Sequence, residues 1–599
     1  MSTYTAPLKD MKFVLNELAG LAEVAKLPGC EEATPDTVDA ILEEAARFAS
    51  GVLDPLNRSG DQEGSKWSDG EVRTPKGFRD AYRQFAEGGW NALPFEPGWG
   101  GQGLPKLVAT PVDEMWTSAN MSFSLCPLLT QGAVHALALR GSEALQQTYI
   151  PKMVTGEWTG TMNLTEPQAG SDLALVKTRA IRAKDEKLGE HYRISGQKIF
   201  ITYGEHDLTK QIVHLVLART PEAPEGTKGI SLFVVPKFLV KPDGSLGGRN
   251  GARCASVEHK LGIHASPTAV MIYENAVGYL VGEENRGLET MFIMMNAARF
   301  GVGLEGVAIA ERAFQRALAF SKERLQGRDL AAGGKTVPII RHPDVRRMLM
   351  LMKSQTEAMR ALAYVVASAL DFANRSPDER VKKQSQAFVD LMIPIVKGWS
   401  TETGIEIASL GVQVHGGMGI VEETGAAQYL RDARITTIYE GTTGIQAMDL
   451  VGRKIAREGG ATARAWLGEL KAFDAELARS GNADIQSLRA QLAAGAQALG
   501  DCVQFIVSEK NPLAAFAGAV PFLKLAGIVA GGWQMARAAL ISDQKLAKEE
   551  GDSSFLKSKI TTARFYGDHV LVQAPGLRDT VVKGSAGVMA LGEDQFFAA

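Results

Sequence analysis

The spacing of apolar residues changes along this chain, and the order of the changes restricts its fold more than any other feature. Apolar residues recur at helical spacing from Thr37 to about Val154. Near Glu157 they begin to alternate with polar residues, as in β-strands, and after Gly287 helical spacing returns in long runs. No repeat of about 20–50 residues interrupts this order. The chain is therefore expected to be an α+β protein in which an antiparallel sandwich or barrel separates helical domains.

Gly, Pro and Asn/Asp turns divide these regions into segments. The expected helices cover residues 37–50, 115–121, 133–138, 142–153, 290–326, 342–372, 378–405, 461–499 and 511–546. The expected strands cover 159–165, 192–195, 197–202, 212–218, 230–235 and 270–273. A length of 599 residues suggests about four domains. We expect an N-terminal arm (1–35), an N-terminal helical domain (36–156), a middle β-domain (157–283), a helical bundle (284–455) and an additional C-terminal helical domain (456–599).

Composition and charge narrow the classes of function. The chain is 45% apolar and 22% charged, as is usual for globular proteins, and its net charge is -3. Lys/Arg and Asp/Glu nearly balance after Ala456, which argues against a nucleic-acid surface. The four cysteines form no CxxC pair, so neither a zinc ribbon nor a disulfide framework is indicated, and a reducing cytoplasm suits them.

Neither targeting nor membrane insertion is indicated. The N-terminal residues are polar and charged, without the apolar core of a signal peptide. The most apolar long stretch, Asn511 to Ala536, contains Pro521 and Lys524. Its many small residues are typical of a buried helix and argue against integral membrane association.

Several motifs are excluded by their context. Residues Gly98 to Gly103 match GxGxxG, but proline-broken loops flank them where a dinucleotide site needs a strand and a helix. The nine histidines form no HxxxH or HExxH pair, so we expect no metal site. GxSxG and GKS/GKT motifs are missing from the sequence, which leaves serine-triad and nucleotide-hydrolysis chemistry without machinery.

Two polar segments at strand ends are candidates for ligand binding. Residues 162–172 place hydroxyls and free backbone N–H groups in a tight loop, which suits a planar hydrogen-bonding ligand. The alternative is an ordinary turn in which Ser171 and Asp172 cap a helix. Residues 198–204 alternate an aromatic, a branched residue and a threonine before a glycine, and the alternative there is a plain strand with Phe200 in the core.

A third segment, residues 431–446, holds a candidate base. Glu440 follows Ile438 and Tyr439 in an apolar, neutral run, and Gly441 follows it. A carboxylate desolvated by such neighbours has a raised pKa and is a stronger base toward carbon acids. The alternative is a surface glutamate in a loop. Upstream, Gln413 begins a glycine-rich turn where backbone can approach a ligand closely.

Four motifs in this order resemble the acyl-CoA dehydrogenase family. They are TEPxAGSD at 165–172, KxxIT at 198–202, QVHGG at 413–417 and RDARI…IYEGT at 431–442, and the resemblance covers roughly residues 36–453. It implies a helical domain, a middle antiparallel β-domain and a C-terminal four-helix bundle. It also implies FAD as cofactor and α,β-dehydrogenation of an acyl-CoA thioester to a trans-2-enoyl-CoA.

The resemblance also implies a role for individual residues. Glu440 matches the family's base for the α-proton, while FAD N5 accepts the β-hydride. Some members place the base just before the arginine that matches Arg299, but Ala298 stands there and cannot take a proton. The implied FAD contacts are Met162, Leu164, Thr165, Phe200, Thr202, Arg324, Gln413, Gly416, Gly417 and Thr442. The implied substrate contacts are Ser171, Asn296, Arg299, Tyr439 and Gly441.

The ends of the chain resemble one group within the family. The chain continues well past the IYEGT helix, as in large bacterial members that include 3-methylmercaptopropionyl-CoA dehydrogenases and medium- and long-chain acyl-CoA dehydrogenases. The resemblance implies a homodimer that passes electrons to an electron-transfer flavoprotein. Two alternatives stay open: an acyl-CoA oxidase using O₂, and a flavin-containing DNA-binding relative of the same fold. The acyl chain also stays open.

Overall fold

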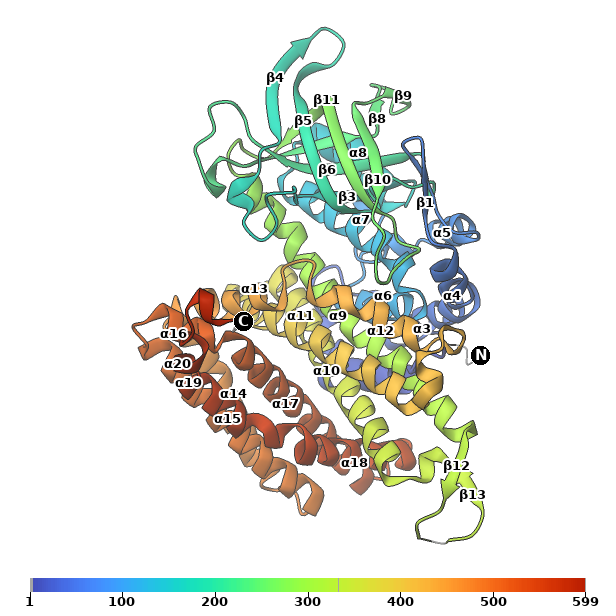
Figure 1. The fold of residues 1–599 in the computed structure, drawn as a ribbon, viewed down its shortest axis with the longest axis vertical. Coiled ribbons are helices and arrows are strands. Elements are labelled where there is room, and N and C mark those ends of the chain that lie inside the picture. Colours follow the sequence, from blue (N-terminus) through green and yellow to red (C-terminus); the bar gives the residue numbers. More distant parts are fainter. Residues whose placement is uncertain (1–3, 332, 598–599) are drawn as a thin grey trace. The chain divides into compact units, whose positions relative to one another are not determined.

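The computed structural model describes residues 4–331 and 333–597, and the chain divides into two compact units. One unit comprises Ala45–Leu104 and Met115–Gly301, and contains the β-sheet, so it is called the sheet unit. The other comprises Met1–Glu44, Pro105–Glu114 and Val302–Ala599, and is called the helical unit. Figure 1 shows the elements of both, coloured along the sequence.

Helices of the sheet unit surround an aromatic core. They are α4 (Asp54–Glu63), α5 (Phe78–Glu87), α7 (Met121–Arg140) and α8 (Glu143–Val154), together with the ends of α3 (Pro35–Phe48) and α6 (Lys106–Ala119). The rings of Trp90 and Trp116 lie 5.1 Å apart and those of Phe85 and Phe123 lie 5.8 Å apart. The expected helices 37–50 and 142–153 are confirmed, and Ser142 caps α8 by accepting a hydrogen bond from the Leu145 N–H.

The sheet has seven strands among the described residues, in the order β3-β6-β7-β11-β5-β4 with β10 paired to β11. Their bounds are β3 Trp158–Asn163, β4 Arg179–Asp185, β5 Gly189–Thr202, β6 Gln211–Ala218, β7 Ser231–Pro236, β10 Ala252–Val257 and β11 Thr268–Val281. The short hairpins are β1 (Lys66–Ser68) with β2 (Glu71–Arg73) and β8 (Phe238–Val240) with β9 (Leu246–Arg249). α7 packs against β3 (Figure 1). A Cβ at Gly160 would lie 2.6 Å from the Cβ of Ala133, so only glycine permits this close approach.

The sheet differs from the expected one in four respects. β3 pairs in parallel with β6, because the intervening β4 and β5 form a long crossover connection, so the sheet is mixed rather than antiparallel throughout. The expected strands 192–195 and 197–202 are a single strand, β5. The expected strand 270–273 is part of the longer β11, and β4 was missed because its exposed, mostly polar residues lack alternation.

The helical unit is built around three long helices. They are α9 (Gly287–Glu323), which belongs to this unit from Val302 onward, α10 (Pro343–Arg375) and α11 (Glu379–His415). α11 begins at the cap Asp378, as expected, but runs ten residues past the expected end at 405. Between and after them lie β12 (Leu325–Arg328), β13 (Thr336–Pro338), α12 (Ala426–Ala433) and α13 (Thr443–Met448).

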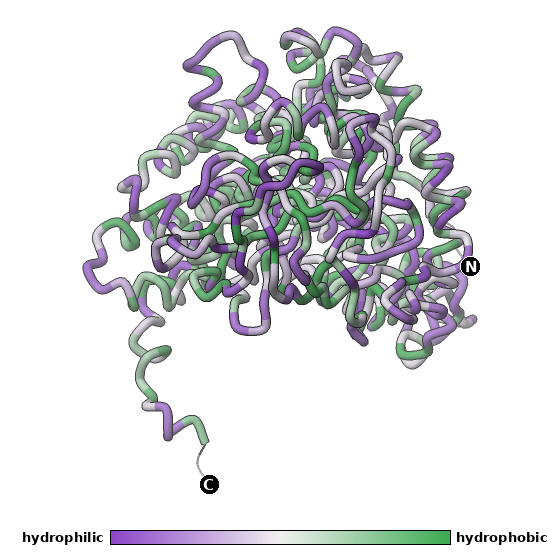
Figure 2. Tube along the Cα trace, turned by 90° about the horizontal axis from the view of Figure 1, so that it is seen from above, coloured by the Kyte–Doolittle hydropathy of each residue, from purple (hydrophilic) through white to green (hydrophobic). Residues whose placement is uncertain are grey.

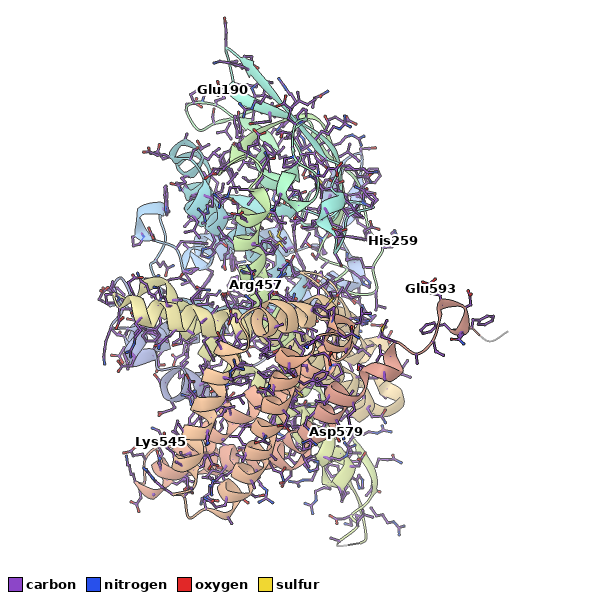
Figure 3. The ribbon with its side chains drawn as sticks, turned by 90° about the vertical axis from the view of Figure 1, so that its left-hand side faces the viewer. Glu190, His259, Arg457, Lys545, Asp579 and Glu593 are labelled. Atoms are coloured by element: carbon purple, nitrogen blue, oxygen red, sulfur yellow. The ribbon has the colours of Figure 1, made fainter. Side chains whose placement is uncertain are left out.

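A layer of C-terminal helices packs on this bundle. It contains α14 (Ala461–Leu477), α15 (Ala483–Ser508), α16 (Pro512–Ala517), α17 (Ala519–Ala547), α18 (Ser553–His569), α19 (Ala574–Lys583) and α20 (Ser585–Val588). The expected helix 461–499 is two helices, because Asn482 interrupts it and caps α15. α17 is central to the layer, and a Cβ at Gly527 would lie 2.1 Å from Cγ of Trp399 on α11. The segment after α20 extends away from the helices of this unit (Figure 2), and Glu593 marks it in Figure 3.

An N-terminal arm completes the helical unit. Its elements are α1 (Leu8–Phe13), η1 (Val14–Leu18) and α2 (Leu21–Val24). Asp10 of the arm accepts hydrogen bonds from Arg360 Nη1 at 2.7 Å and Lys559 Nζ at 2.5 Å. The Arg360 guanidinium also binds Glu114 and Glu311, both at 2.7 Å. This buried ionic network joins the arm, the central bundle and α18.

Two helices among the described residues are long and apolar enough to cross a membrane, namely α7 and α9. Their most apolar windows are 78% and 67% buried inside the fold, as in core helices. The stretch from Asn511 to Ala536 forms α16 and most of α17, whose residues are largely buried. The domain boundaries drawn from the sequence stay predictions.

Candidate active site

The loop Ile438–Thr442, called the catalytic loop below, has an unusual backbone. Glu440 has φ +56° and Gly441 has φ +87°, so both lie in the left-handed region. Such a conformation is disfavoured for a residue with a side chain and persists only where its surroundings impose it. Thr442 ends the loop by capping α13, because its hydroxyl accepts a hydrogen bond from the Ile445 N–H at 3.2 Å.

Hydrogen bonds to two backbone carbonyls fix this conformation. Gln446 Nε2 on α13 donates to the Glu440 carbonyl at 3.0 Å. Lys397 Nζ on α11 donates to the Gly441 carbonyl at 2.7 Å. Gln446 and Lys397 are fully buried, so their side chains hold the loop from inside the helical unit.

Two side-chain contacts anchor the loop and its continuation. The Tyr439 hydroxyl donates to Oε2 of Glu305 on α9, and Glu305 is 1% exposed. Just beyond the loop, the Thr443 hydroxyl donates to Oε1 of Glu402 on α11 at 2.5 Å. Burial raises the pKa of Glu305 to about 8, although Tyr439 and the charge of Lys397 oppose that rise.

The Glu440 side chain is half-buried, while Ile438 is 48% exposed. The interpretation of Glu440 as an ordinary surface glutamate therefore does not describe its position. The desolvation of the Glu440 carboxylate that the sequence suggests stays a prediction.

In the sheet unit, the loop after β3 is fixed by a buried ion pair. Glu166 is 3% exposed, and Lys198 on β5 is fully buried. Lys198 Nζ donates to Glu166 Oε1 at 2.8 Å and to the Leu164 carbonyl at 2.9 Å. Burial raises the pKa of Glu166, but the charge of Lys198 and the hydrogen bonds to the carboxylate outweigh it, so the pKa lies below its usual value. Burial lowers the pKa of Lys198 to about 8 despite the neighbouring carboxylate.

The expected flavin contacts of this unit lie on β3, in the loop after β3 and along β5. The Ile199 N–H donates to the Thr165 carbonyl at 2.9 Å, which brings the two segments together. Thr165 and Thr202 are half-buried. Met162 is half-buried, and Leu164 is buried.

Phe200 stands out among these residues. It lies at a break in the register of β5 against β11, has φ +59°, and is 59% exposed. The plain-strand interpretation, in which Phe200 belongs to the core, is therefore wrong. A strained backbone that turns a large aromatic ring outward is typical of a site that contacts a ligand.

The three expected substrate contacts outside the catalytic loop differ in how much of each residue is exposed to solvent. Ser171 is exposed in the turn after β3, where the side chain of Asp172 accepts a hydrogen bond from the Ala174 N–H at 3.0 Å. Asn296 on α9 is exposed, whereas Arg299 is 6% exposed, with its guanidinium carbon 6.0 Å from the Phe292 ring centroid.

The remaining expected FAD contacts lie at the ends of α9 and α11. The rings of Phe320 and His415 stack with centroids 4.3 Å apart, so the last turns of these helices lie side by side. Arg324, just past α9, and Gln413 are exposed. Gly416 (φ +58°) and Gly417 follow α11 and are exposed too, and an added Cβ at either would meet nothing within 4 Å.

The buried polar residues that hold the loops are not among the residues predicted from the sequence, above all Glu305, Lys397, Glu166 and Lys198. One signal was present: Glu305 and Lys397 are single charges within apolar helical runs. A lone buried charge needs a partner, so such a residue marks a specific contact. No group of three or more metal-ligating side chains occurs within residues 4–331 and 333–597.

Family models match nearly the whole chain in the order of its structure. They are acyl-CoA dehydrogenase N-terminal domain (35–157), middle domain (161–276) and C-terminal domain (285–456), followed by acetyl-CoA dehydrogenase C-terminal like (466–592). These matches define an oxidoreductase with a helical, sheet and helical core and an added helical domain. The chain belongs to the acyl-CoA dehydrogenase family, which confirms the resemblance of the motifs and the expected fold class.

Individual relatives agree with this assignment. The 3-methylmercaptopropionyl-CoA dehydrogenase of Ruegeria pomeroyi is 50% identical over 95% of this chain and 96% of its own length. A butyryl-CoA dehydrogenase of Syntrophomonas wolfei is 33% identical over 96% of each chain. The structure of an acyl-CoA dehydrogenase complexed with FAD from Bacillus anthracis has a TM-score of 0.71, at 20% identity, over 97% of this chain and 93% of that one.

The chain is an FAD-dependent oxidoreductase that acts on acyl-CoA. Its residues fit the cofactor: the sheet unit presents an exposed aromatic ring at Phe200, and Thr165 and Thr202 are half-buried residues of the same unit. A ring and hydroxyls suit a planar heterocycle with hydrogen-bonding edges. The glycines after α11 leave open backbone, and the nearby cation of Arg324 suits a phosphate.

Proposed function

We propose that the protein oxidises a short acyl-CoA thioester to the trans-2-enoyl-CoA, with Glu440 as the base. The conformation of the catalytic loop is the observation that supports this role. Glu440 is held in a left-handed backbone conformation by Gln446 and Lys397, which donate hydrogen bonds to the successive carbonyls of Glu440 and Gly441. Rigid presentation of a carboxylate is what abstraction of a weakly acidic α-proton requires.

The reaction balances as follows. The Glu440 carboxylate takes the α-proton, and the electron pair of that C–H bond forms the double bond between Cα and Cβ. FAD, when bound, accepts the hydride that leaves the β-carbon. The backbone N–H of Glu440 is assigned as a donor to the thioester oxygen, where negative charge develops. One such donor typically lowers the barrier by about 3–4 kcal/mol.

Binding roles follow from the exposure of the other residues. We assign Phe200, Thr165 and Thr202 to the flavin ring, with Met162 and Leu164 lining its site. Arg324, Gln413, Gly416, Gly417 and Thr442 are assigned to the rest of FAD, and Ser171, Asn296, Arg299, Tyr439 and Gly441 to acyl-CoA. Removing the aromatic ring of Phe200 is expected to weaken FAD retention without unfolding the sheet unit, since the ring is mostly exposed.

The proposed substrate class is a short acyl chain, with 3-methylmercaptopropionyl-CoA as the first candidate. The support is the 50% identity to the Ruegeria pomeroyi enzyme over 95% of the chain, against 33% to the butyryl-CoA enzyme. Anaerobic bleaching of the flavin by 3-methylthiopropanoyl-CoA and by C4 to C16 acyl-CoAs tests this. Fastest bleaching by a C12 or longer chain would contradict it.

Electron acceptor and assembly complete the proposal. We propose an electron-transfer flavoprotein as acceptor, a homodimer, a bacterial cytoplasmic location and a role in acyl-chain degradation of the β-oxidation type. The exposed Arg324 and Gly416 support a dimer, because the family motifs they match meet FAD across a subunit interface. Peroxide formed in air without the flavoprotein, at a rate matching turnover, would favour the oxidase alternative.

The base assignment has a direct test. Glu440→Gln is expected to leave yellow, FAD-loaded protein that acyl-CoA does not bleach under anaerobic conditions. The matched control is Glu422→Gln, which changes an exposed carboxylate of the same unit that pairs with Arg431 and should bleach normally. Normal bleaching by the Glu440 variant would remove this residue from the mechanism.

A further inference from the structure

Glu305 is a buried acid that has no role in the reaction proposed above. It lies on α9 between Gly303 and Gly306, where α9 packs directly against the backbone of α11. A Cβ at Gly306 would lie 2.4 Å from the Ser400 carbonyl oxygen, and one at Gly303 would lie 2.7 Å from Val396 Cγ1. This close crossing fixes the position of the Glu305 side chain relative to α11.

The carboxyl group of Glu305 has one partner on the catalytic loop. Its Oε2 accepts the hydrogen bond of the Tyr439 hydroxyl, and its Oε1 is buried without a hydrogen-bond partner among the described residues. Burying an ionised carboxylate with so little compensation is costly, so the neutral acid is the favoured form. The titratable groups that face it are Lys397 on α11 and Tyr439 and Glu440 on the catalytic loop.

We propose that Glu305 is a positioning residue, which acts through Tyr439 to hold Glu440 in the conformation that takes the α-proton. This inference rests on the role of Glu440 proposed above. Lys397 and Gln446 fix the carbonyls of Gly441 and Glu440, but neither restrains the residue before Glu440. The bond between Glu305 and Tyr439 supplies that restraint on the other side of the base.

The charge of Glu305 matters as well as its position. Because burial raises its pKa to about 8, it is mostly neutral at pH 7. Above that pH it ionises and places a second negative charge beside Glu440 and near the charge that develops on the thioester. The rate of flavin reduction is therefore expected to fall as the pH rises through about 8.

Four variants separate position from charge. Glu305→Leu and Tyr439→Phe each remove the hydrogen bond, and each should lower kcat about ten- to hundredfold with KM changed less than about twofold. The variant that carries both substitutions should have the same kcat as the slower single variant, because the two substitutions remove the same hydrogen bond. Glu305→Gln keeps an acceptor for Tyr439 but cannot ionise. Its kcat should be at least tenfold higher than that of Glu305→Leu. Its rate of flavin reduction should not decline as the pH rises through 8.

The matched control is another buried bond of the same kind. The Tyr364 hydroxyl donates to Glu114 Oε2 at 2.7 Å, far along the chain from the catalytic loop. Tyr364→Phe should keep both the wild-type kcat and the wild-type decline above pH 8. Each variant is measured as FAD-loaded protein with a concentration series of one acyl-CoA. Steady-state turnover with an artificial electron acceptor gives kcat and KM, and anaerobic stopped-flow reduction gives the pH dependence of flavin reduction.

Two results would overturn the proposal. One is a Glu305→Gln variant with the same alkaline decline as wild type. The other is a pair of FAD-loaded Glu305→Leu and Tyr439→Phe variants with wild-type kcat. The Glu440→Gln variant is measured in parallel. If acyl-CoA bleaches its flavin normally, the assignment of Glu440 as the base is refuted. If this variant is inactive while the Glu305 variants keep the wild-type rate, only the positioning role of Glu305 is refuted.

Discussion

Replacing Lys559 by methionine is expected to destabilise the helical unit through the arm. Lys559 Nζ lies 2.5 Å from Asp10 and 2.8 Å from Glu357, and its side chain is only 3% exposed. Methionine fills a similar volume without the charge, so the two carboxylates lose a cation but no large cavity forms. Breaking a buried pair in this way typically costs about 3–5 kcal/mol.

The ion pairs that remain after the substitution determine where the loss of unfolding free energy falls within that range. Asp10 keeps the Arg360 guanidinium at 2.7 Å, and Glu357 keeps Lys353. Because each carboxylate retains one cation, we expect a loss near the lower end, about 3 kcal/mol. Urea unfolding at pH 7, followed by circular dichroism with refolding checked, measures it.

The pH dependence gives a second readout. Burial raises the pKa of Asp10, but Lys559 and Arg360 outweigh it and hold the pKa well below its ordinary 3.8. A carboxylate with a lowered pKa stabilises the fold above pH 3.8, and that contribution is lost as the pH falls. The difference between wild type and Lys559→Met should therefore be full at pH 7 and shrink as the pH falls below 3.8.

A matched surface pair provides the control. Lys9 and Asp552 also join the arm to α18, 2.7 Å apart, but their side chains are 75% and 46% exposed. Lys9→Met should cause no measurable loss, because water screens such a pair. An equal effect of Lys9→Met and Lys559→Met, or a loss below about 1 kcal/mol for the latter, would refute the reasoning from burial.

Three further predictions concern packing, cofactor retention and pH. Gly527→Ala should destabilise by about 1–3 kcal/mol because its Cβ would overlap the indole on α11, whereas Gly468→Ala, open on an exposed helix face, should stabilise by about 0.5–1 kcal/mol in the same urea assay. Lys198→Met should loosen the loop after β3, so FAD should dissociate faster in gel filtration while the circular dichroism spectrum is kept. Burial lowers the pKa values of His206 and His214 to about 3, so their stabilising effect is present above pH 6.5 and lost as the pH falls. Unfolding curves from pH 7 to 4 test this, and stability unchanged over that range would contradict it.

The parts of the site that lie in one contiguous segment could be predicted from the sequence. Glu440 stands out because it lies between Tyr439 and Gly441 in an apolar, neutral run and within the IYEGT motif, although its role as the base stays a prediction. The long helices α9 and α10 were predicted because their apolar spacing persists over many turns. Local signals of this kind need no tertiary information.

The unpredicted parts depend on pairings between distant residues. Glu305 and Tyr439 are 134 positions apart, and Lys397 and Gly441 are 44 apart. The parallel pairing of β3 with β6 depends on how two other strands cross over, which periodicity does not show. The outward turn of Phe200 requires a positive φ, and phenylalanine has no preference for it that a sequence could reveal.

The ionic network around Asp10 also has a consequence for the order of synthesis. Asp10 and Lys559 are 549 positions apart, so a ribosome making about 5–20 residues per second needs roughly 30–110 s to deliver the second after the first. Residues 115–301 of the sheet unit are complete long before then. Until α18 emerges, Asp10 of the nascent chain lacks one of its two cationic partners, so the complete ionic network forms only near the end of synthesis.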